Sequence, residues 1–410
     1  MKHLTTTALS LTLALAATGA FAECGIGAGS VRILSNDFEA LHAVINAAKT
    51  CEGGGVTVVS NATTEHAELQ VPGMTGSPAE YTVKILANDS IVPLLNEGLL
   101  RPLDDLVAKY GQDLQPMQLI KIDGKVMAIA FMANAQHLIY RADLLKNAGI
   151  EPPKTYEEVL AAGQALKDKG LLETPLGLNN LPGWDLAEEF VNMYLGHGGA
   201  FFAPGSAEFA LDPAKATATL EMMKALSALM PADNNTFETN VLSALYQQGK
   251  VGIMNMWGSR AGSFIGPDAQ PEVAASTVFA AAPTVGGGSI PATALWWDGF
   301  SIAQNISDED AEASFRAMIL GIRLEMATAN PDAAAWLIKG FQPGPASAGV
   351  IASAQGGAIS YPMVPQMGVL HTALGSELSD FMAGKESAEQ ALADVKASYE
   401  SAAREQGFLQ

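Results

Sequence analysis

The chain has 410 residues, which is more than a single hydrophobic core usually organises, since domains seldom exceed ~250–300 residues. Hydrophobic residues make up 49% and charged residues 16%, which excludes a disordered or coiled-coil chain. The formal net charge of −20 makes nucleic acid and anionic membrane surfaces poor partners. We therefore expect a globular protein of two lobes that does not bind nucleic acid.

The first 22 residues have the three parts of a secretory signal. Met1-Lys2-His3 is a short basic start, residues 9–17 are an apolar run, and Ala20-Phe21-Ala22 is a small-x-small cleavage site. The apolar run is shorter than the ~20 residues that a membrane-spanning helix needs. Residues 1–22 are therefore predicted to be a cleaved signal peptide.

Two cysteines, Cys24 and Cys51, agree with export. In an oxidising compartment an isolated pair is expected to form a disulfide rather than a catalytic or metal site. A lipid-anchored protein carries a small residue directly before the modified cysteine, whereas Cys24 follows Glu23. We expect a soluble periplasmic protein without a lipid anchor.

Strands and helices alternate three times in the first hundred residues of the mature chain. The apolar patterns predict strands at 31–34, 56–59 and 81–86 and helices at 38–48, 63–69 and 90–96. This order predicts a parallel sheet with helices on both faces, in which ligands bind at the carboxyl ends of the strands.

Polar side chains follow each of these strands, and Asn36, Asn61 and Asn88 stand among them. Asn, Asp and Ser commonly cap the helix that follows, so capping and ligand binding are both open at these positions. We take the three asparagines as candidate ligand contacts.

A second α/β series begins after residue 135. It is predicted to contain helices at 155–169, 212–230, 239–248, 307–326 and 387–405 and strands at 251–256 and 300–302.

Sequence motifs for catalysis are missing. No Gly-x-x-x-x-Gly-Lys-Ser/Thr, Gly-x-Gly-x-x-Gly or Gly-x-Ser-x-Gly occurs. The pair His66 and Glu68 is interpreted as a solvated helix face, and the adjacent carboxylates Glu188 and Glu189 diverge by about 100° on a helix. We expect no catalytic residue, no metal and no cofactor, although carboxylates from different loops could still meet.

Tryptophan is scarce, and three positions pair it with polar neighbours. These are Trp184 beside Asp185, Trp257 three residues before Arg260, and Trp297 beside Asp298. An indole stacks on the C–H face of a sugar ring while the polar neighbours bind hydroxyls, but core packing would also explain any one site. The recurrence favours a shared cleft that contains Trp184, Trp257, Arg260, Trp297 and Asp298. Trp336, in an Ala-rich stretch read as helical, is assigned to the core.

A long segment resembles a known family. Residues 123–131, Asn134-Ala135-Gln136, Tyr140-Arg141-Ala142-Asp143-Leu144-Leu145 and residues 148–158 are similar in order and spacing to the signature of the family 1 extracellular solute-binding proteins of bacterial ABC importers. Gln248-Gly249-Lys250-Val251-Gly252 and the segment 298–302 also fit this family.

The resemblance implies the type II periplasmic-binding-protein fold, an α/β fold of two lobes, each with a mainly parallel sheet flanked by helices and with several interlobe crossings. On this basis residues 23–132 and about 284–330 form the first lobe, and residues 133–283 and about 331–410 the second. Asn134 would lie near the hinge and contact the ligand.

The resemblance also implies a monomer that binds a sugar or polyol and delivers it to the transmembrane subunits of an ABC permease. Two other ligands stay open, a glycerophosphodiester and a polyamine. A periplasmic carbohydrate-active enzyme is the alternative from another class, and it requires two carboxylates that face each other across the cleft.

Overall fold

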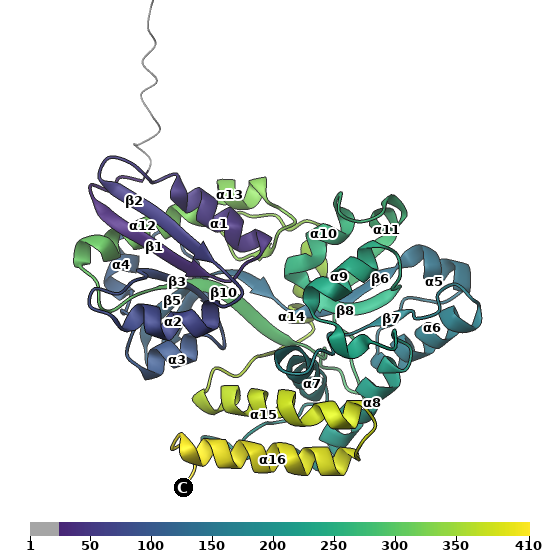
Figure 1. Cartoon of the computed structure of the whole chain (residues 1–410). Coiled ribbons are helices and arrows are strands. Elements are labelled where there is room, and N and C mark those ends of the chain that lie inside the picture. The colour runs from purple at the N-terminus through teal and green to yellow at the C-terminus, as the bar shows by residue number, and fades with distance from the viewer. Residues whose placement is uncertain (1–23) are drawn as a thin grey trace, which may run out of the picture.

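The computed structural model describes residues 24–410, so the predicted signal peptide lies outside the described residues. Two α/β lobes stand side by side, and the C-terminal helices α15 (Pro365–Met382) and α16 (Ala388–Glu405) lie beneath helix α7 (Trp184–Gly196) (Figure 1). This arrangement confirms the predicted α/β fold of two lobes.

The first lobe contains the predicted series of alternating strands and helices. Strands β1 (Gly29–Ser35), β2 (Val56–Ala62) and β3 (Val83–Ala87) are parallel, with β1 between the other two. The connecting helices are α1 (Glu39–Lys49), α2 (His66–Thr75) and α3 (Ile91–Asn96). The carboxyl ends of the three strands therefore meet at one edge of the sheet, as the sequence predicted.

Two long strands make the first sheet mixed. Strand β5 (Lys125–Asn134) runs out of the first lobe, and β10 (Ala294–Ile302) returns to it between β5 and β3, antiparallel to both. A strand that re-enters from the cleft must run opposite to strands that end there. The predicted parallel arrangement is therefore right for β1, β2 and β3 and wrong for β5 and β10, since β10 is antiparallel to both β3 and β5.

The second sheet is mixed as well. Its order is β7 (Leu176–Gly177), β8 (Ile253–Trp257), β6 (Gln136–Arg141) and β9 (Thr277–Ala280). Only the β7–β8 pair is parallel, because β6 follows β5 directly across the lobe boundary and enters the sheet from the cleft side. The remaining elements are α4 (Asp104–Tyr110), β4 (Leu119–Ile122), α5 (Ala142–Ala148), α6 (Tyr156–Asp168), α8 (Pro213–Ser227), α9 (Thr239–Gln247), α10 (Ala261–Ile265), α11 (Pro271–Ser276), α12 (Asp308–Gly321), α13 (Leu324–Ala329), β11 (Ala335–Trp336), α14 (Ala348–Gln355) and β12 (Ile359–Ser360).

Capping residues fix where the second-lobe helices begin. The Thr155 hydroxyl accepts a hydrogen bond from the Glu158 amide at 3.1 Å, which starts α6. The Asp212 carboxylate accepts the amides of Ala214 and Lys215 at the start of α8. Both starts agree with the sequence prediction.

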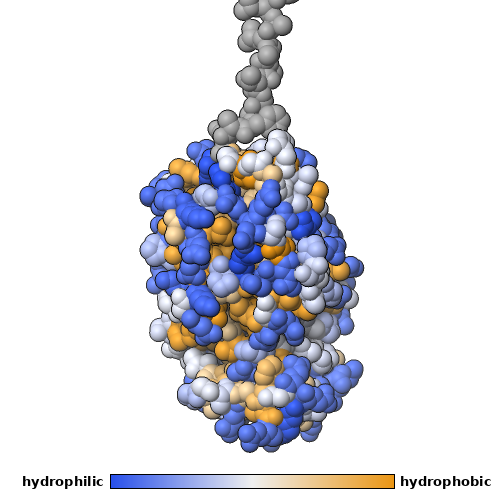
Figure 2. All heavy atoms as spheres, turned by 90° about the vertical axis from the view of Figure 1, so that its left-hand side faces the viewer, coloured by the Kyte–Doolittle hydropathy of each residue, from blue (hydrophilic) through white to orange (hydrophobic). Residues whose placement is uncertain are grey.

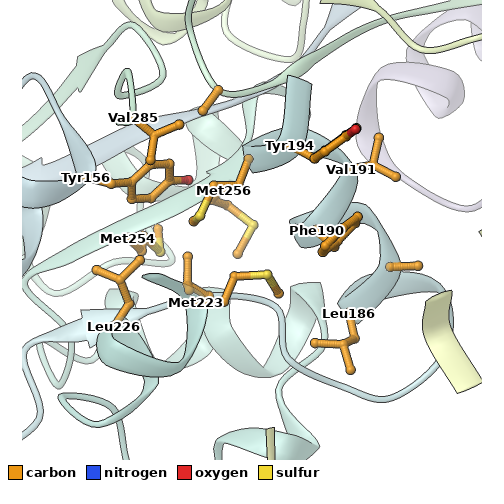
Figure 3. Packing of buried hydrophobic residues seen from close by; sticks show 14 of the residues in the cluster. Tyr156, Leu186, Phe190, Val191, Tyr194, Met223, Leu226, Met254, Met256 and Val285 are labelled. Carbon is orange, nitrogen blue, oxygen red and sulfur yellow. The ribbon is translucent and has the colours of Figure 1, made fainter. Parts of the chain in front are cut away.

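Each lobe has its own hydrophobic core. In the second lobe Phe190 and Tyr194 of α7 stack with ring centroids 5.6 Å apart, and Met223 of α8 and Met256 of β8 belong to the same cluster (Figure 3). The whole of α7 from Leu186 to its end is buried. In the first lobe Trp336 is a core residue as predicted, but it lies in strand β11 rather than in a helix.

Cys24 and Cys51 form the predicted disulfide, which ties the segment before β1 to the end of α1. The face of the molecule in Figure 2 is mostly hydrophilic, with apolar residues in small separate patches. Among residues 24–410, every helix is too short or too polar to cross a membrane.

Candidate ligand-binding site

A cavity of about 480 Å³ lies between the two lobes. The first-lobe wall is built from residues that follow β1, β2 and β3, including Asn36, His66 and Asp89. The second-lobe wall comes from the start of α7, the start of α9 and the segment after β8. The cavity therefore lies where parallel strands end, which is the usual ligand position in open α/β sheets.

Six of the nine predicted site residues line this cavity. Those are Asn36, Asn134, Trp184, Trp257, Arg260 and Asp298. Asn134 also joins the walls, because its amide nitrogen donates to the Ser259 hydroxyl at 3.2 Å and its oxygen accepts the Ser259 amide. These contacts hold the end of β5 against the segment that carries Arg260.

The structure places the other three predicted residues away from the cavity wall. Asn61 donates to the Tyr81 hydroxyl at 3.0 Å on the outer strand β2. Asn88 is buried beneath β10, where its side-chain oxygen accepts the amide of Trp297 at 2.8 Å. Trp297 packs in a core cluster of the first lobe, because successive side chains of a strand point to opposite faces and its neighbour Trp296 takes the cavity side.

Three tryptophans from distant segments form one aromatic wall. The Trp184 ring lies 6.0 Å from Trp257 and 5.8 Å from Trp296, measured between centroids, and Trp257 and Trp296 are 6.0 Å apart. Trp184 is 43% exposed, whereas Trp257 and Trp296 are nearly buried. This wall can stack on the apolar face of a ring-shaped or extended ligand.

Residues behind the wall fix the orientation of the indoles. Trp296 donates its ring N–H to Glu188 at 2.9 Å and packs against the Tyr361 ring, with the ring centroids 4.2 Å apart. His371 contacts the Trp184 carbonyl through Nε2 at 3.0 Å and the Tyr361 hydroxyl through Nδ1 at 2.9 Å. Because a carbonyl can only accept, His371 is protonated on Nε2 and accepts from Tyr361.

Burial disfavours a charge on these supporting groups. It lowers the pKa of His371 to about 4 and raises the pKa of Glu188 well above its ordinary value. The sequence interpretation considered Glu188 only as a helix carboxylate and did not single out His371. Their partners lie more than a hundred residues away, so no local pattern could have identified them.

A buried lysine organises the first-lobe wall. Lys84 of β3 is fully buried, and its ammonium donates to Nδ1 of His66 at 2.7 Å. Nδ1 is therefore the acceptor nitrogen, and the imidazole proton lies on Nε2. Burial and the neighbouring Lys84 charge lower the pKa of His66 to about 3, so the ring stays neutral. His66 thus lines the cavity with a fixed tautomer, contrary to the solvated helix face that the sequence suggested.

Carboxylates of both walls resist ionisation. The pKa of Asp298 is raised to about 7, mainly by burial and to a smaller extent by the nearby Asp89. On the opposite wall, the pKa of Asp185 is also raised to about 7, mainly by burial and to a smaller extent by Glu238. Burial also lowers the pKa of Arg260 from its ordinary value. These shifts show that the cavity desolvates charge, as ligand-binding sites commonly do.

The position of Trp184 depends on a glycine contact between α7 and α15. Gly183 donates its amide to the Gly375 carbonyl at 3.0 Å, and a Cβ on Gly375 would clash with the Gly183 backbone. We expect Gly375→Ala to displace the segment that carries Trp184 and to weaken ligand binding about tenfold. Titration calorimetry measures the loss.

Gly368→Ala is the matched control, since it is the same change in the same helix where an added Cβ meets no atom within 4 Å. Gly368→Ala should leave affinity unchanged. Equal losses in the two variants would show that α15 rigidity, rather than the contact with Gly183, governs binding.

Known proteins share this architecture. In a solved structure from Agrobacterium radiobacter K84, a solute-binding protein of an ABC transporter in complex with ribitol, the fold matches with a TM-score of 0.78 at 19% identity, over 91% of this chain and 98% of that one. The maltose-bound protein MalE3 of T. maritima matches with a TM-score of 0.78 at 16% identity, over 91% and 99% of the two chains.

A curated relative from Rhizobium meliloti (strain 1021), described as a probable sugar-binding periplasmic protein, is 28% identical over 284 residues. The match spans 64% of this chain and 65% of the relative, just under two thirds of its length. The family model for bacterial extracellular solute-binding proteins matches residues 34–317, more than half of the chain. The chain with this cavity between its lobes therefore belongs to the bacterial extracellular solute-binding protein family.

Proposed function

We propose that the chain is the periplasmic substrate-binding component of an ABC importer and captures a carbohydrate or polyol between its lobes. The observation that carries this proposal is the pairing of an aromatic wall with polar side chains that lack protein partners. Trp184, Trp257 and Trp296 offer flat apolar faces, while Arg260 and Asp298 line the same cavity with side chains that form no hydrogen bond to the described residues. Sugars and polyols present both kinds of surface.

The comparisons support the same ligand class. The similar proteins from Agrobacterium radiobacter K84 and T. maritima carry ribitol and maltose, and the Rhizobium meliloti relative is described as sugar-binding. Family membership favours capture without chemistry over an enzyme, although carboxylates do line both walls, as an enzyme would require.

Capture would proceed by hinge closure. The first core includes Met132 and the second includes Leu138, so the chain crosses between the lobes near Asn134. Contacts that form from both walls only in the closed state would shift the open–closed equilibrium toward closure. The closed protein would then deliver its ligand, as a monomer, to the transmembrane permease subunits.

For the lobes we keep residues 23–132 with about 284–330 and residues 133–283 with about 331–410. Two boundaries are better moved. Val285, Ala292 and Ala294 pack in the second core, which favours a returning first-lobe segment that begins after Trp296. Ala333, Trp336 and Ile338 pack in the first core, which favours a first lobe that extends to about residue 340.

Export through the signal peptide 1–22, without a lipid anchor, completes the proposal. The Cys24 thiol is engaged in the disulfide with Cys51, which leaves it unable to carry a lipid at the same time.

A thermal-shift screen tests the ligand class, because a ligand that binds only the folded state stabilises it by about 2.7 kcal/mol at a hundred times its Kd. The purified protein is screened against neutral sugars, amino sugars, polyols, glycerophosphodiesters and polyamines. At least one sugar or polyol should raise the Tm and remain intact by mass spectrometry after incubation. Stabilisation by spermidine or glycerophosphocholine alone, or cleavage of the bound sugar, would refute the proposal.

A further inference from the structure

Charge is distributed unevenly on the cavity wall. Five carboxylates line the cavity, against one guanidinium, that of Arg260. The chain as a whole has 43 acidic and 23 basic residues, so the wall is more acidic than the protein that contains it. The carboxylates are Asp37, Asp89, Asp185, Glu238 and Asp298.

Three of the five carboxylates have partners within the protein. Asp37 contacts His42 at 2.7 Å, and Glu238 caps α9 by accepting two backbone amides. Asp89 accepts the amide of Ser90 at 2.6 Å. The side chains of Asp185 and Asp298 have no hydrogen-bond partner among residues 24–410, and they belong to opposite walls.

The cations near the cavity do not balance these two groups. Lys84 is buried and donates to His66. Asp89 and Asp298 both act electrostatically on Lys84, whose single positive charge can balance only one of them. Arg260 forms no ion pair within 4 Å among the described residues, and its guanidinium lies 5.9 Å from the Phe38 ring centroid.

The raised pKa values of Asp185 and Asp298, both about 7, agree with this imbalance. They indicate that each charge is costly in the empty cavity and that a bound cation would relieve the cost.

The aromatic wall can also bind a cation. The faces of Trp184, Trp257 and Trp296 attract a positive group through their ring quadrupoles, and tryptophan does so best among the aromatic side chains. A neutral sugar would use the stacking surface but leave Asp185 and Asp298 without a counter-charge. An anionic ligand would be repelled by the same two groups.

We infer that the ligand is a carbohydrate or polyol bearing a protonated amino group, which Asp185 and Asp298 bind from opposite walls beside the tryptophans. This inference rests on the proposed function and narrows its substrate class to the cationic carbohydrates and polyols.

Matched pairs test the inference directly. Titration calorimetry at pH 7.5 compares glucosamine with glucose, galactosamine with galactose, and glucamine with sorbitol, with N-acetylglucosamine as the uncharged control for bulk. The amine should bind at least tenfold more tightly than its neutral parent in the best pair. Its advantage should shrink at pH 5.5, where Asp185 and Asp298 are protonated, and in 0.5 M salt.

Variants locate the charge. In the double variant Asp185→Asn/Asp298→Asn, the affinities for the amine and for its neutral parent should differ by less than about threefold. The Glu405→Gln variant changes an exposed carboxylate and should keep the full preference for the amine. Loss of the preference in Glu405→Gln as well would show that overall charge, not the cavity, attracts the amine.

Other outcomes separate this inference from the proposed function. Neutral parents that bind as tightly as the amines would overturn the inference and leave the proposed function intact. Calcium chloride that stabilises the protein more than the amines would show a metal site and also overturn the inference. If no sugar or polyol of either kind binds, both proposals fail.

Discussion

Trp296→Ala is expected to weaken ligand binding about a hundredfold, the loss typical of a central aromatic anchor. Its indole is buried, donates a hydrogen bond to Glu188 at 2.9 Å and packs against the Tyr361 ring, so it is held in place before the ligand arrives. It also packs against Trp184 and Trp257, and its removal would release both rings. Titration calorimetry with the best ligand from the screen measures the change.

Two other tryptophans provide the controls. Trp297→Phe alters the neighbouring ring, which lies in a first-lobe core, and Trp336→Phe alters a ring whose N–H donates to the Asn330 carbonyl at 2.8 Å. Both should lower the Tm and change affinity less than threefold, since neither residue lines the cavity. Trp296→Phe retains a ring and should lose less affinity than Trp296→Ala. A larger affinity loss in Trp297→Phe than in Trp296→Ala would reverse the assignment of the two faces of β10.

Local patterns were sufficient to predict the first half of the first lobe. The strands at β1, β2 and β3 alternate with helices, and each contact among them joins neighbouring units of the chain. The antiparallel insertion of β10 between β3 and β5 joins residues more than 160 positions apart, as in the pair Asp298 and Met132. The periodicity of a single strand does not indicate which distant strand it pairs with. The sequence therefore predicted mainly parallel sheets and missed the antiparallel strands.

The site shows the same limit. Trp184, Trp257, Arg260 and Asp298 were predicted to share a cleft because tryptophans recur beside polar side chains in these segments, and all four residues line the cavity. Trp296 and Trp297 carry the same side chain on a strand buried on both faces, so alternation of polarity could not tell which one faces the cavity.

The partners of the buried polar groups beside the cavity could not be predicted from local sequence patterns either. Lys84 interrupts an apolar strand, which is a visible signal of a buried charge, but its partner His66 and the nearby Asp298 come from other segments. The sequence therefore shows that a buried lysine needs partners, whereas only the fold shows which residues supply them.

Asp298→Asn is expected to stabilise the ligand-free protein at pH 8, although it removes a predicted ligand contact. Burial and Asp89 raise the pKa of Asp298 from 3.8 to about 7, so the folded state binds this proton more tightly than the unfolded state does. Stability therefore falls as the pH rises from about 4 to about 7, and the full cost remains above pH 7. Asparagine stays neutral and leaves Lys84 paired with Asp89 alone.

The gain should be on the order of 2 kcal/mol at pH 8, because part of the roughly 4 kcal/mol that three pKa units represent is shared with Asp89 and Lys84. Calorimetric scans from pH 4 to 8 should show the variant with a Tm higher by about 2–4 °C at pH 8 and equal to wild type near pH 4. Asp308→Asn should have the opposite sign, since Arg101 lowers the pKa of Asp308 by a hydrogen bond. If Asp298→Asn is instead less stable than wild type at pH 8, Lys84 already balances the charge of Asp298. Asp185 would then be the one carboxylate of the pair that still lacks a counter-charge for a cationic ligand to supply.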